Sequence, residues 1–136
     1  MKEKIIAKIK EISQYLTELE EIVPDNFAQY EKNFRDRAAC ERFFEKIIEA
    51  CVDLGFMLIK YKKLPVPTTD KELFAILGKN KIITSAIAMK LSEAKGMRNL
   101  LAHEYALIRD DLVYSAVHGE VIPDVEQFLN EIKREI

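Results

Sequence analysis

The sequence contains few residues that break helices and few that support redox chemistry. Among its 136 residues are four glycines, four prolines, two cysteines, two histidines and no tryptophan. The scarcity of glycine and proline favours helices over a turn-rich β fold. Cys40 and Cys51 are eleven residues apart, which on one helix separates them by about 16 Å and excludes a disulfide between them. We expect both to be small core residues in a reducing compartment.

Long apolar runs and close metal-ligand pairs are also missing. The N-terminal stretch MKEKIIAKIKEISQYL carries a charge every few positions and lacks the apolar block of a signal peptide. No segment approaches the roughly 18 apolar residues that a membrane span needs. The four cysteines and histidines lack the paired spacing of a zinc site. We therefore expect a cytoplasmic protein with no membrane contact, no metal and no cofactor.

The composition, with 49% apolar and 32% charged residues, is that of a globular chain, and we expect residues 1–136 to form a single domain. Its charges are distributed unevenly. Residues 60–109 carry ten Lys and Arg against four Asp and Glu, whereas residues 110–136 carry two against seven. The middle of the chain could present a basic surface to a polyanion. The simpler alternative is a solvated helix face that is rich in lysine.

Apolar residues recur with alternating steps of four and three, which is the period of an amphipathic helix. The first such stripe ends before Pro24 and comprises Ile5, Ile9, Ile12, Leu16, Leu19 and Val23. A longer helix is expected over roughly residues 27–62, with the stripe Cys40, Phe44, Ile47, Cys51, Leu54, Leu58 and Tyr61. Residues 50–59 are apolar nearly all round, and residues 43–59 are too apolar for the surface of a monomer. We expect the rest of the bundle to cover one side of this segment, and a second subunit could cover another.

A proline-containing loop separates these helices from the second half of the chain. Thr69 followed by Glu72 predicts a capping box that starts a short helix, which Gly78 ends. A fourth helix is expected from about residue 81 to about residue 102.

Asp110 is expected to cap the last helical stretch, with Gly119 and Pro123 breaking or kinking it. No convincing strand pattern is present. The predicted fold is an all-α antiparallel helical bundle with two long central helices and additional shorter helices.

One charged residue falls on the apolar stripe of the fourth helix, which reads Ile87, Leu91, Ala94, Arg98, Leu101 and Tyr105. A buried, unpaired guanidinium is costly, so Arg98 needs a partner or opens onto a cleft or an interface. His103 lies five residues further on, about 140° round a regular helix. The two side chains could converge if the helix ended near Ala102, or if two copies of the segment faced one cleft across a two-fold axis.

A purely structural interpretation of these residues is also available. Arg98 and His103 could complement the dipole at the end of the helix, and Tyr105 could be a core residue with its hydroxyl at the surface. Spacing alone favours this simpler interpretation.

The segment RNLLAHEY resembles the R-x4-H-x-Y signature of the HEPN superfamily, in its HepT-like toxin branch. The stretch RAACERFFEKIIEACVDLG, the proline-containing loop, the GMRN lead-in and a closing helix with Phe128 resemble that branch too. The resemblance covers roughly residues 35–135. It implies a HEPN-like bundle and a metal-independent endoribonuclease toxin of a type VII-like toxin–antitoxin pair, acting as a homodimer on RNA. It also implies a nucleotidyltransferase antitoxin that adds AMP to the motif tyrosine, here Tyr105.

The motif residues suit this chemistry, because RNA carries its own nucleophile, the 2′-hydroxyl. His103 could move protons as base or acid, and Arg98 could stabilise charge on the phosphate. Asn99 could orient either the phosphate or His103. AMP on Tyr105 would add bulk and negative charge where the substrate phosphate must enter.

Two other functions remain open from the sequence. The chain could be a non-catalytic HEPN-like module that only forms a complex with a nucleotidyltransferase. A coiled-coil-like scaffold without a site would suit the apolar stripes, but it would leave Arg98 unexplained.

Overall fold

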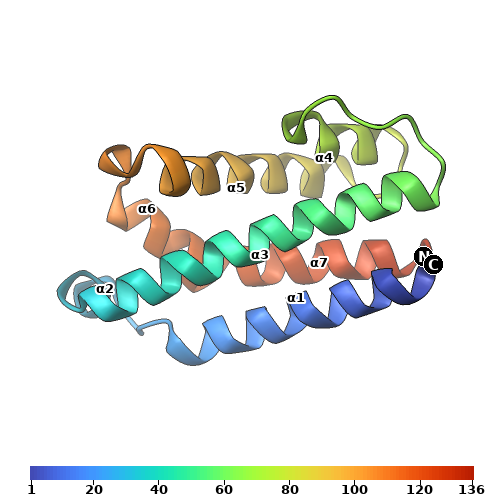
Figure 1. Ribbon diagram of the computed structural model, residues 1–136. Coiled ribbons are helices and arrows are strands. Elements are labelled where there is room, and N and C mark those ends of the chain that lie inside the picture. The colour runs from blue at the N-terminus through green and yellow to red at the C-terminus, as the bar shows by residue number, and fades with distance from the viewer.

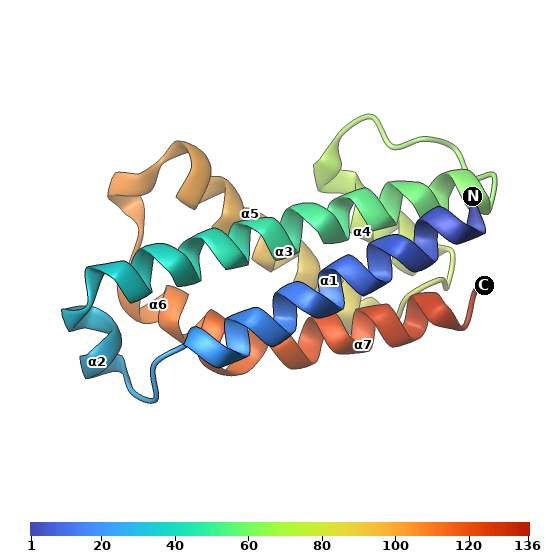
Figure 2. The same ribbon diagram turned by 60° about the horizontal axis from the view of Figure 1, so that its bottom comes forward.

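The computed structural model describes residues 1–136 as a bundle of helices without strands. Four long helices run along the bundle: α1 (Lys2–Ile22), α3 (Phe34–Tyr61), α5 (Ser85–His103) and α7 (Val121–Lys133). Successive long helices run in opposite directions, and α3 packs against the other three (Figure 1). Figure 2 shows α1 and α7 side by side on the face opposite α5. The predicted all-α antiparallel bundle is therefore confirmed.

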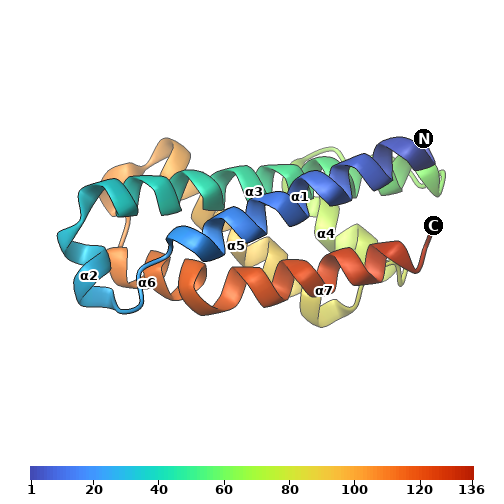
Figure 3. The same cartoon turned by 90° about the horizontal axis from the view of Figure 1, so that it is seen from below.

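The two ends of the bundle carry different elements. α2 (Phe27–Lys32), α6 (Asp110–Ser115) and a 3₁₀ turn (Tyr105–Leu107) lie at the end where α5 finishes and α3 begins. Both chain termini lie at the opposite end, as the view from below shows (Figure 3). α4 (Asp70–Lys79) packs against α5 and α3 nearer to the termini. The candidate functional residues at the end of α5 are therefore far from both termini.

The helix expected over residues 27–62 is in fact two helices, separated by Asn33. The backbone of Asn33 is extended, and its Oδ1 accepts hydrogen bonds from the N–H groups of Arg35 and Asp36, at 3.1 Å each. Asparagine is among the preferred N-cap residues because its side chain satisfies the free N–H groups of a first turn. The predicted apolar stripe begins only at Cys40, so it carried no information about the junction, and the prediction missed the break.

α4 begins as predicted, but a neighbouring threonine makes the capping contacts. Thr69 occupies the N-cap position without a side-chain hydrogen bond. Instead, the N–H and Oγ1 of Thr68 bond to Oε2 of Glu72, at 3.3 and 3.0 Å. The predicted capping box paired Glu72 with Thr69, which was wrong, because Glu72 accepts hydrogen bonds from Thr68 instead. Gly78 lies inside the helix, which ends at Lys79.

α5 begins at Ser85, four residues later than expected, and its N-terminus is anchored to α7. Oγ1 of Thr84 accepts the N–H of Ile87 at 3.3 Å. The N–H of Thr84 in turn donates to Oε1 of Glu131 at 2.7 Å. Glu131 is buried, and a carboxylate beside a helix N-terminus is stabilised by the helix dipole. This contact fixes the position of α5 relative to α7.

The last helical stretch is distorted but continuous. The prediction of Asp110 as the cap was wrong, because Arg109 occupies the N-cap position and Asp110 is the first residue of α6, without a side-chain capping bond. A π-helical turn, Ala116–Glu120, contains Gly119 and joins α6 to α7. Pro123 lies three residues after the π turn, and its ring nitrogen has no N–H to donate to the preceding turn of this continuous stretch. The predicted irregularity is therefore a π turn rather than a break.

The buried side chains form one hydrophobic cluster of 34 residues. The predicted stripes of α1 and α3 lie within it except for their last residues, Val23 and Tyr61, which are half-buried and pack against it. Cys40 and Cys51 are buried and free, as expected. Residues 43–59 are covered by α1, α4, α5 and α7 of the same chain, so a second subunit is not needed to bury this segment. No helix combines the length and apolarity required to cross a membrane.

Candidate functional site at the end of α5

The motif residues lie along the last turns of α5 and in the turn that follows. α5 stays helical through His103, and the N–H of Glu104 closes it by donating to the carbonyl of Leu100 at 2.9 Å. Arg98 and His103 therefore keep a separation of about 140° around the helix. An early helix end does not bring the two side chains together, so only the second of the two predicted routes to convergence remains, through another copy of the chain.

Arg98 is partly buried between α5 and α3. Its side chain is 21% exposed, and Nη2 lies 3.7 Å from Oε2 of Glu49 on α3. Nη1 reaches Oδ1 of Asn99 at 3.4 Å. The Nε–H, in contrast, is buried without a hydrogen-bond partner. Not all N–H groups of this guanidinium have hydrogen-bond acceptors, so it could still donate hydrogen bonds to a bound anion.

Asn99 lies between two cations. Its Oδ1 accepts a hydrogen bond from Nζ of Lys95 at 3.1 Å, in addition to the longer contact from Arg98. Nζ of Lys95 also lies 3.6 Å from Oδ2 of Asp70 on α4. The structure therefore connects Asn99 to Arg98 and not to His103. Lys95 joins this group although the sequence interpretation did not select it.

His103 is the last residue of α5 and is exposed. Its imidazole takes part in no side-chain hydrogen bond or ion pair within the chain. An exposed imidazole on a helix end is free to meet a substrate or another protein surface. Because no contact within the chain orients the imidazole, His103 needs further groups to position it for proton transfer.

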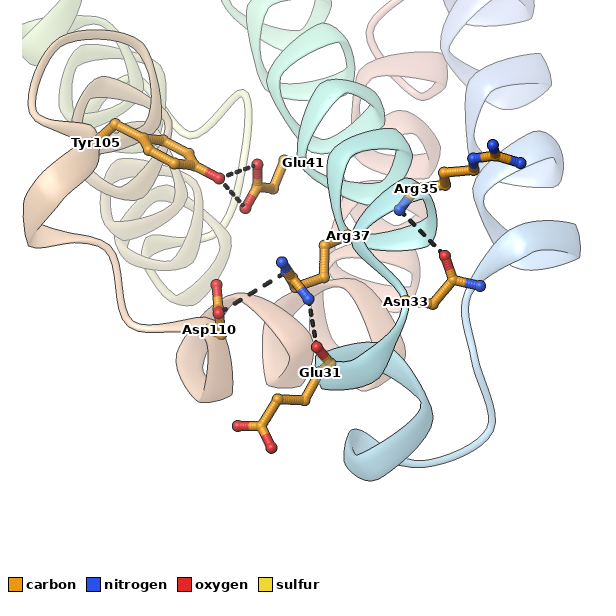
Figure 4. Close-up of polar contacts among 7 residues, drawn as sticks. All are labelled: Glu31, Asn33, Arg35, Arg37, Glu41, Tyr105 and Asp110. Carbon is orange, nitrogen blue, oxygen red and sulfur yellow. Dashed lines mark hydrogen bonds and ion pairs between the residues drawn. The ribbon is translucent and has the colours of Figure 1, made fainter.

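Tyr105 reverses the expected arrangement of a core tyrosine. The residue is 58% exposed, while its hydroxyl points inward and donates to Glu41 on α3, with distances of 2.8 and 2.9 Å to the two carboxylate oxygens (Figure 4). Glu41 is only 7% exposed. The hydrogen bond to Glu41, together with partial burial, raises the pKa of Tyr105 to about 12.

Glu41 was missed by the sequence interpretation, although a signal for it exists. It lies on a buried row of α3 with steps of three and four: Glu41, Phe44, Ile48, Cys51 and Gly55. This is the same kind of signal that singled out Arg98, a charged residue on an apolar stripe. Burial raises the pKa of the Glu41 carboxyl, and the Tyr105 hydrogen bond lowers it in part.

The predicted basic region does not form one free cationic surface. Five of its ten cations lie within 4.0 Å of a carboxylate: Lys62, Lys90, Lys95, Arg98 and Arg109. Such pairs are weak at the surface, but they reduce the field that a polyanion would meet. The simpler alternative, a solvated and lysine-rich face, describes much of this region.

The five best-formed grooves of the chain contain none of the motif residues. A groove of about 450 Å³ between α5 and α7 is lined by Leu91, Ala94 and Met97 on its α5 side, but it includes neither Arg98, Asn99, His103 nor Tyr105. Asn99, His103 and Tyr105 are exposed around the end of α5, and Arg98 is partly buried beside them. A site made from them needs another molecule to enclose it.

The antiparallel bundle and the R-x4-H-x-Y spacing at the end of its third long helix define a HEPN-like protein. The family described as "Ribonuclease HepT-like" matches residues 12–132. The chain belongs to the HepT-like ribonuclease family.

Two relatives of the chain are named as nucleases, and a solved structure with this fold is named as a toxin. The mRNA nuclease HepT of Shewanella oneidensis is 27% identical over 135 residues, which cover 99% of this chain and 100% of that protein. The tRNA nuclease HepT of Aphanizomenon flos-aquae is 28% identical over 113 residues, which cover 83% and 77%. A solved structure of the tri-AMPylated Shewanella oneidensis HEPN toxin in complex with MNT antitoxin matches with a TM-score of 0.88 and 26% identity, over 96% of each chain.

Proposed function

We propose that this chain is a metal-independent endoribonuclease toxin of a type VII-like toxin–antitoxin pair. Residues 1–136 act as one domain, and two copies form the active unit. The support comes from the family match over residues 12–132, from two relatives named as RNA nucleases, and from the placement of Arg98, Asn99 and His103 near the end of α5.

The chemistry starts from the 2′-hydroxyl of RNA, which attacks the adjacent phosphate. His103 takes the 2′-hydroxyl proton or returns a proton to the leaving 5′-oxygen. Arg98 binds the non-bridging phosphate oxygens and stabilises the charge that develops on them. Asn99 positions the guanidinium through its Oδ1, in keeping with the 3.4 Å contact. None of these steps needs a metal ion, and the product carries a 2′,3′-cyclic phosphate.

In a homodimer, Arg98 and His103 from different subunits can meet, although they cannot do so within one chain. Arg98 and His103 point to different sides of α5 because the helix is regular as far as His103. A two-fold axis near the end of α5 places the Arg98 of one subunit opposite the His103 of its mate. The open surface around the motif becomes a cleft between two subunits, and RNA binds there.

A nucleotidyltransferase antitoxin silences the site by adding AMP to Tyr105. The Shewanella oneidensis relative is AMPylated in complex with MNT antitoxin, and Tyr105 is the motif tyrosine, with a side chain that is 58% exposed. The added phosphate places negative charge two residues from His103, where the RNA phosphate must enter.

The observation that carries this proposal is the partly buried Arg98 guanidinium, whose Nε–H lacks a partner at the end of a helix with the family spacing. The test is cleavage of a defined RNA by the purified chain in excess EDTA, with analysis of the product ends. We expect cleavage and 2′,3′-cyclic phosphate ends. Complex formation with a nucleotidyltransferase without any RNA cleavage would instead identify a non-catalytic binding module.

A further inference from the structure

The Tyr105 hydroxyl and the Glu41 carboxylate form a pair at the boundary between solvent and core. Both carboxylate oxygens lie within hydrogen-bond distance of the hydroxyl, at 2.8 and 2.9 Å. The tyrosine approaches from the 3₁₀ turn and stays 58% exposed, whereas the glutamate lies behind it on α3 and is 7% exposed. The pair has the arrangement of a nucleophile with a base within hydrogen-bond reach, in which the Tyr105 ring is exposed and its hydroxyl is turned inward to the base.

We propose that Glu41 is the general base for the modification of Tyr105: it accepts the hydroxyl proton as Oη attacks the α-phosphate of a nucleoside triphosphate. This inference rests on the proposed function, because it presumes nucleotidyl transfer to Tyr105. It assigns the base to the acceptor chain rather than to the transferase. The toxin therefore supplies a catalytic residue for its own inactivation.

The step is balanced as a nucleotidyl transfer. A bond forms between Oη of Tyr105 and the α-phosphorus, and the bond from that phosphorus to the bridging oxygen of the β-phosphate breaks. Pyrophosphate leaves with the electron pair of that bond. The Oη proton moves to Glu41, and the carboxylic acid then releases it to water. The nucleoside triphosphate is the only co-reactant, and the transferase binds it.

A base is needed because the Tyr105 hydroxyl does not ionise readily. The hydrogen bond to Glu41 and partial burial raise the pKa of Tyr105 to about 12, so the phenolate is scarce near neutral pH. Burial also raises the pKa of Glu41, which makes its carboxylate a stronger base than an exposed one. Proton transfer to a positioned base contributes about 10²- to 10⁴-fold in rate.

The charges around Glu41 keep it available for this role. Arg37, one turn earlier on α3, donates to the carbonyl of Glu31, and its Nε lies 4.0 Å from Oδ2 of Asp110 (Figure 4). Arg37 therefore has its own partners and does not form an ion pair with Glu41. The titratable groups that face Glu41 come from four elements: Arg37, Cys40 and Glu45 on α3, Tyr30 on α2, Asp110 on α6, and Tyr105 on the 3₁₀ turn.

Glu41→Gln tests the inference, because glutamine keeps the shape and an acceptor oxygen but cannot take the proton. The matched control is Glu45→Gln, one turn along α3, since Glu45 makes no hydrogen bond to Tyr105. Each full-length chain is mixed with Mg²⁺, ATP and the MNT-type nucleotidyltransferase of the same genome, and intact mass follows AMP addition against time and pH. Circular dichroism confirms that each variant is folded.

We expect the wild-type chain and Glu45→Gln to be modified at similar rates, and Glu41→Gln about 10²-fold more slowly. The rate for Glu41→Gln should also rise about tenfold per pH unit, because hydroxide must then remove the proton. A purely structural role for Glu41 would not create this new pH dependence.

Wild-type rate and pH profile in folded Glu41→Gln would overturn the inference while leaving the proposed function intact. A wild-type chain that takes up no AMP would overturn both. If Glu41→Gln does not fold, Glu41→Asp replaces it, since the shorter carboxylate still accepts a proton. A lower rate with the wild-type pH profile then supports the inference, and an unchanged rate overturns it.

Discussion

Nη2 of Arg98 lies 3.7 Å from Oε2 of Glu49, whereas Nε of the same guanidinium is buried without a partner. The contact is longer than a hydrogen bond, and Glu49 is 52% exposed. The pair is therefore weak. Glu49 holds Arg98 loosely over α3, and under the proposed function we expect an RNA phosphate to compete with Glu49 for the cation.

Replacing Glu49 should strengthen RNA binding. Glu49→Gln keeps the shape of the side chain and removes the competing charge. We therefore expect the affinity for RNA to rise a few-fold. The slope of log affinity against log salt concentration should become steeper by about one, which corresponds to one more counterion released. Fluorescence anisotropy across a KCl series measures both, in a His103→Ala background in which the proposed mechanism predicts no cleavage. Glu45→Gln is the control for a charge change on the same helix. Weaker binding by Glu49→Gln would mean that Glu49 positions Arg98 instead of competing for it.

The Tyr105 hydroxyl should contribute to stability through Glu41. Tyr105→Phe leaves a buried carboxylate without its donor, which should lower the free energy of unfolding by about 1–2 kcal/mol at neutral pH. Urea denaturation measures the change. Tyr61→Phe removes a hydroxyl that has no hydrogen-bond partner and should have little effect. Equal losses in the two variants would show that the Glu41 contact adds nothing to stability.

The stability of the chain should depend on the titration of Glu41. Burial raises the pKa of this carboxyl in the folded state above its ordinary value of 4.5. The folded chain therefore binds the proton more tightly, and the stability from this group is lost as the pH rises from about 4.5 through the raised folded pKa. Glu41→Gln removes this dependence.

Melting temperatures of the wild type and Glu41→Gln, measured from acidic to neutral pH, check this sign. We expect the wild type to lose stability relative to the variant as the pH rises. A difference that stays constant with pH would show that Glu41 titrates alike in the folded and unfolded chains.

The two-subunit site predicts complementation between inactive variants. When Arg98→Ala and His103→Ala chains are co-expressed with different tags, about half of the dimers are mixed, and one of the two sites in each mixed dimer is intact. RNA cleavage should therefore return to about a quarter of the wild-type rate. Each variant alone should remain inactive, and continued inactivity of the purified mixed dimer would place each site within one chain.

The sequence predicted the helices well because their apolar periodicity is strong, and it predicted their ends less well. Asn33 and Thr84 start helices through local hydrogen bonds that the apolar stripe does not reveal. Contacts between distant segments were also hidden. The stripe pointed to Arg98 as a residue that needs a partner, but only the folded chain shows that the partner is Glu49.

Tyr105 shows why residue type and spacing did not define the site. Its position on the stripe suggested a core ring with an exposed hydroxyl. The structure has an exposed ring with an inward hydroxyl, because the hydroxyl donates to the buried Glu41. Glu41 is 64 residues away in sequence, so spacing within the motif could not reveal this partner. Likewise, the sequence allowed two ways for Arg98 and His103 to meet. The regular end of α5 leaves the one that requires a second subunit.

The rate of RNA cleavage by folded His103→Ala and Arg98→Ala chains, measured in EDTA against the wild type, tests the central claim most directly. The proposed mechanism predicts a fall of at least about 10²-fold in each variant, because one loses the proton carrier and the other the phosphate contact. Circular dichroism and thermal melting establish that both variants are folded. Cleavage by either folded variant at the wild-type rate would contradict the assignment of the site.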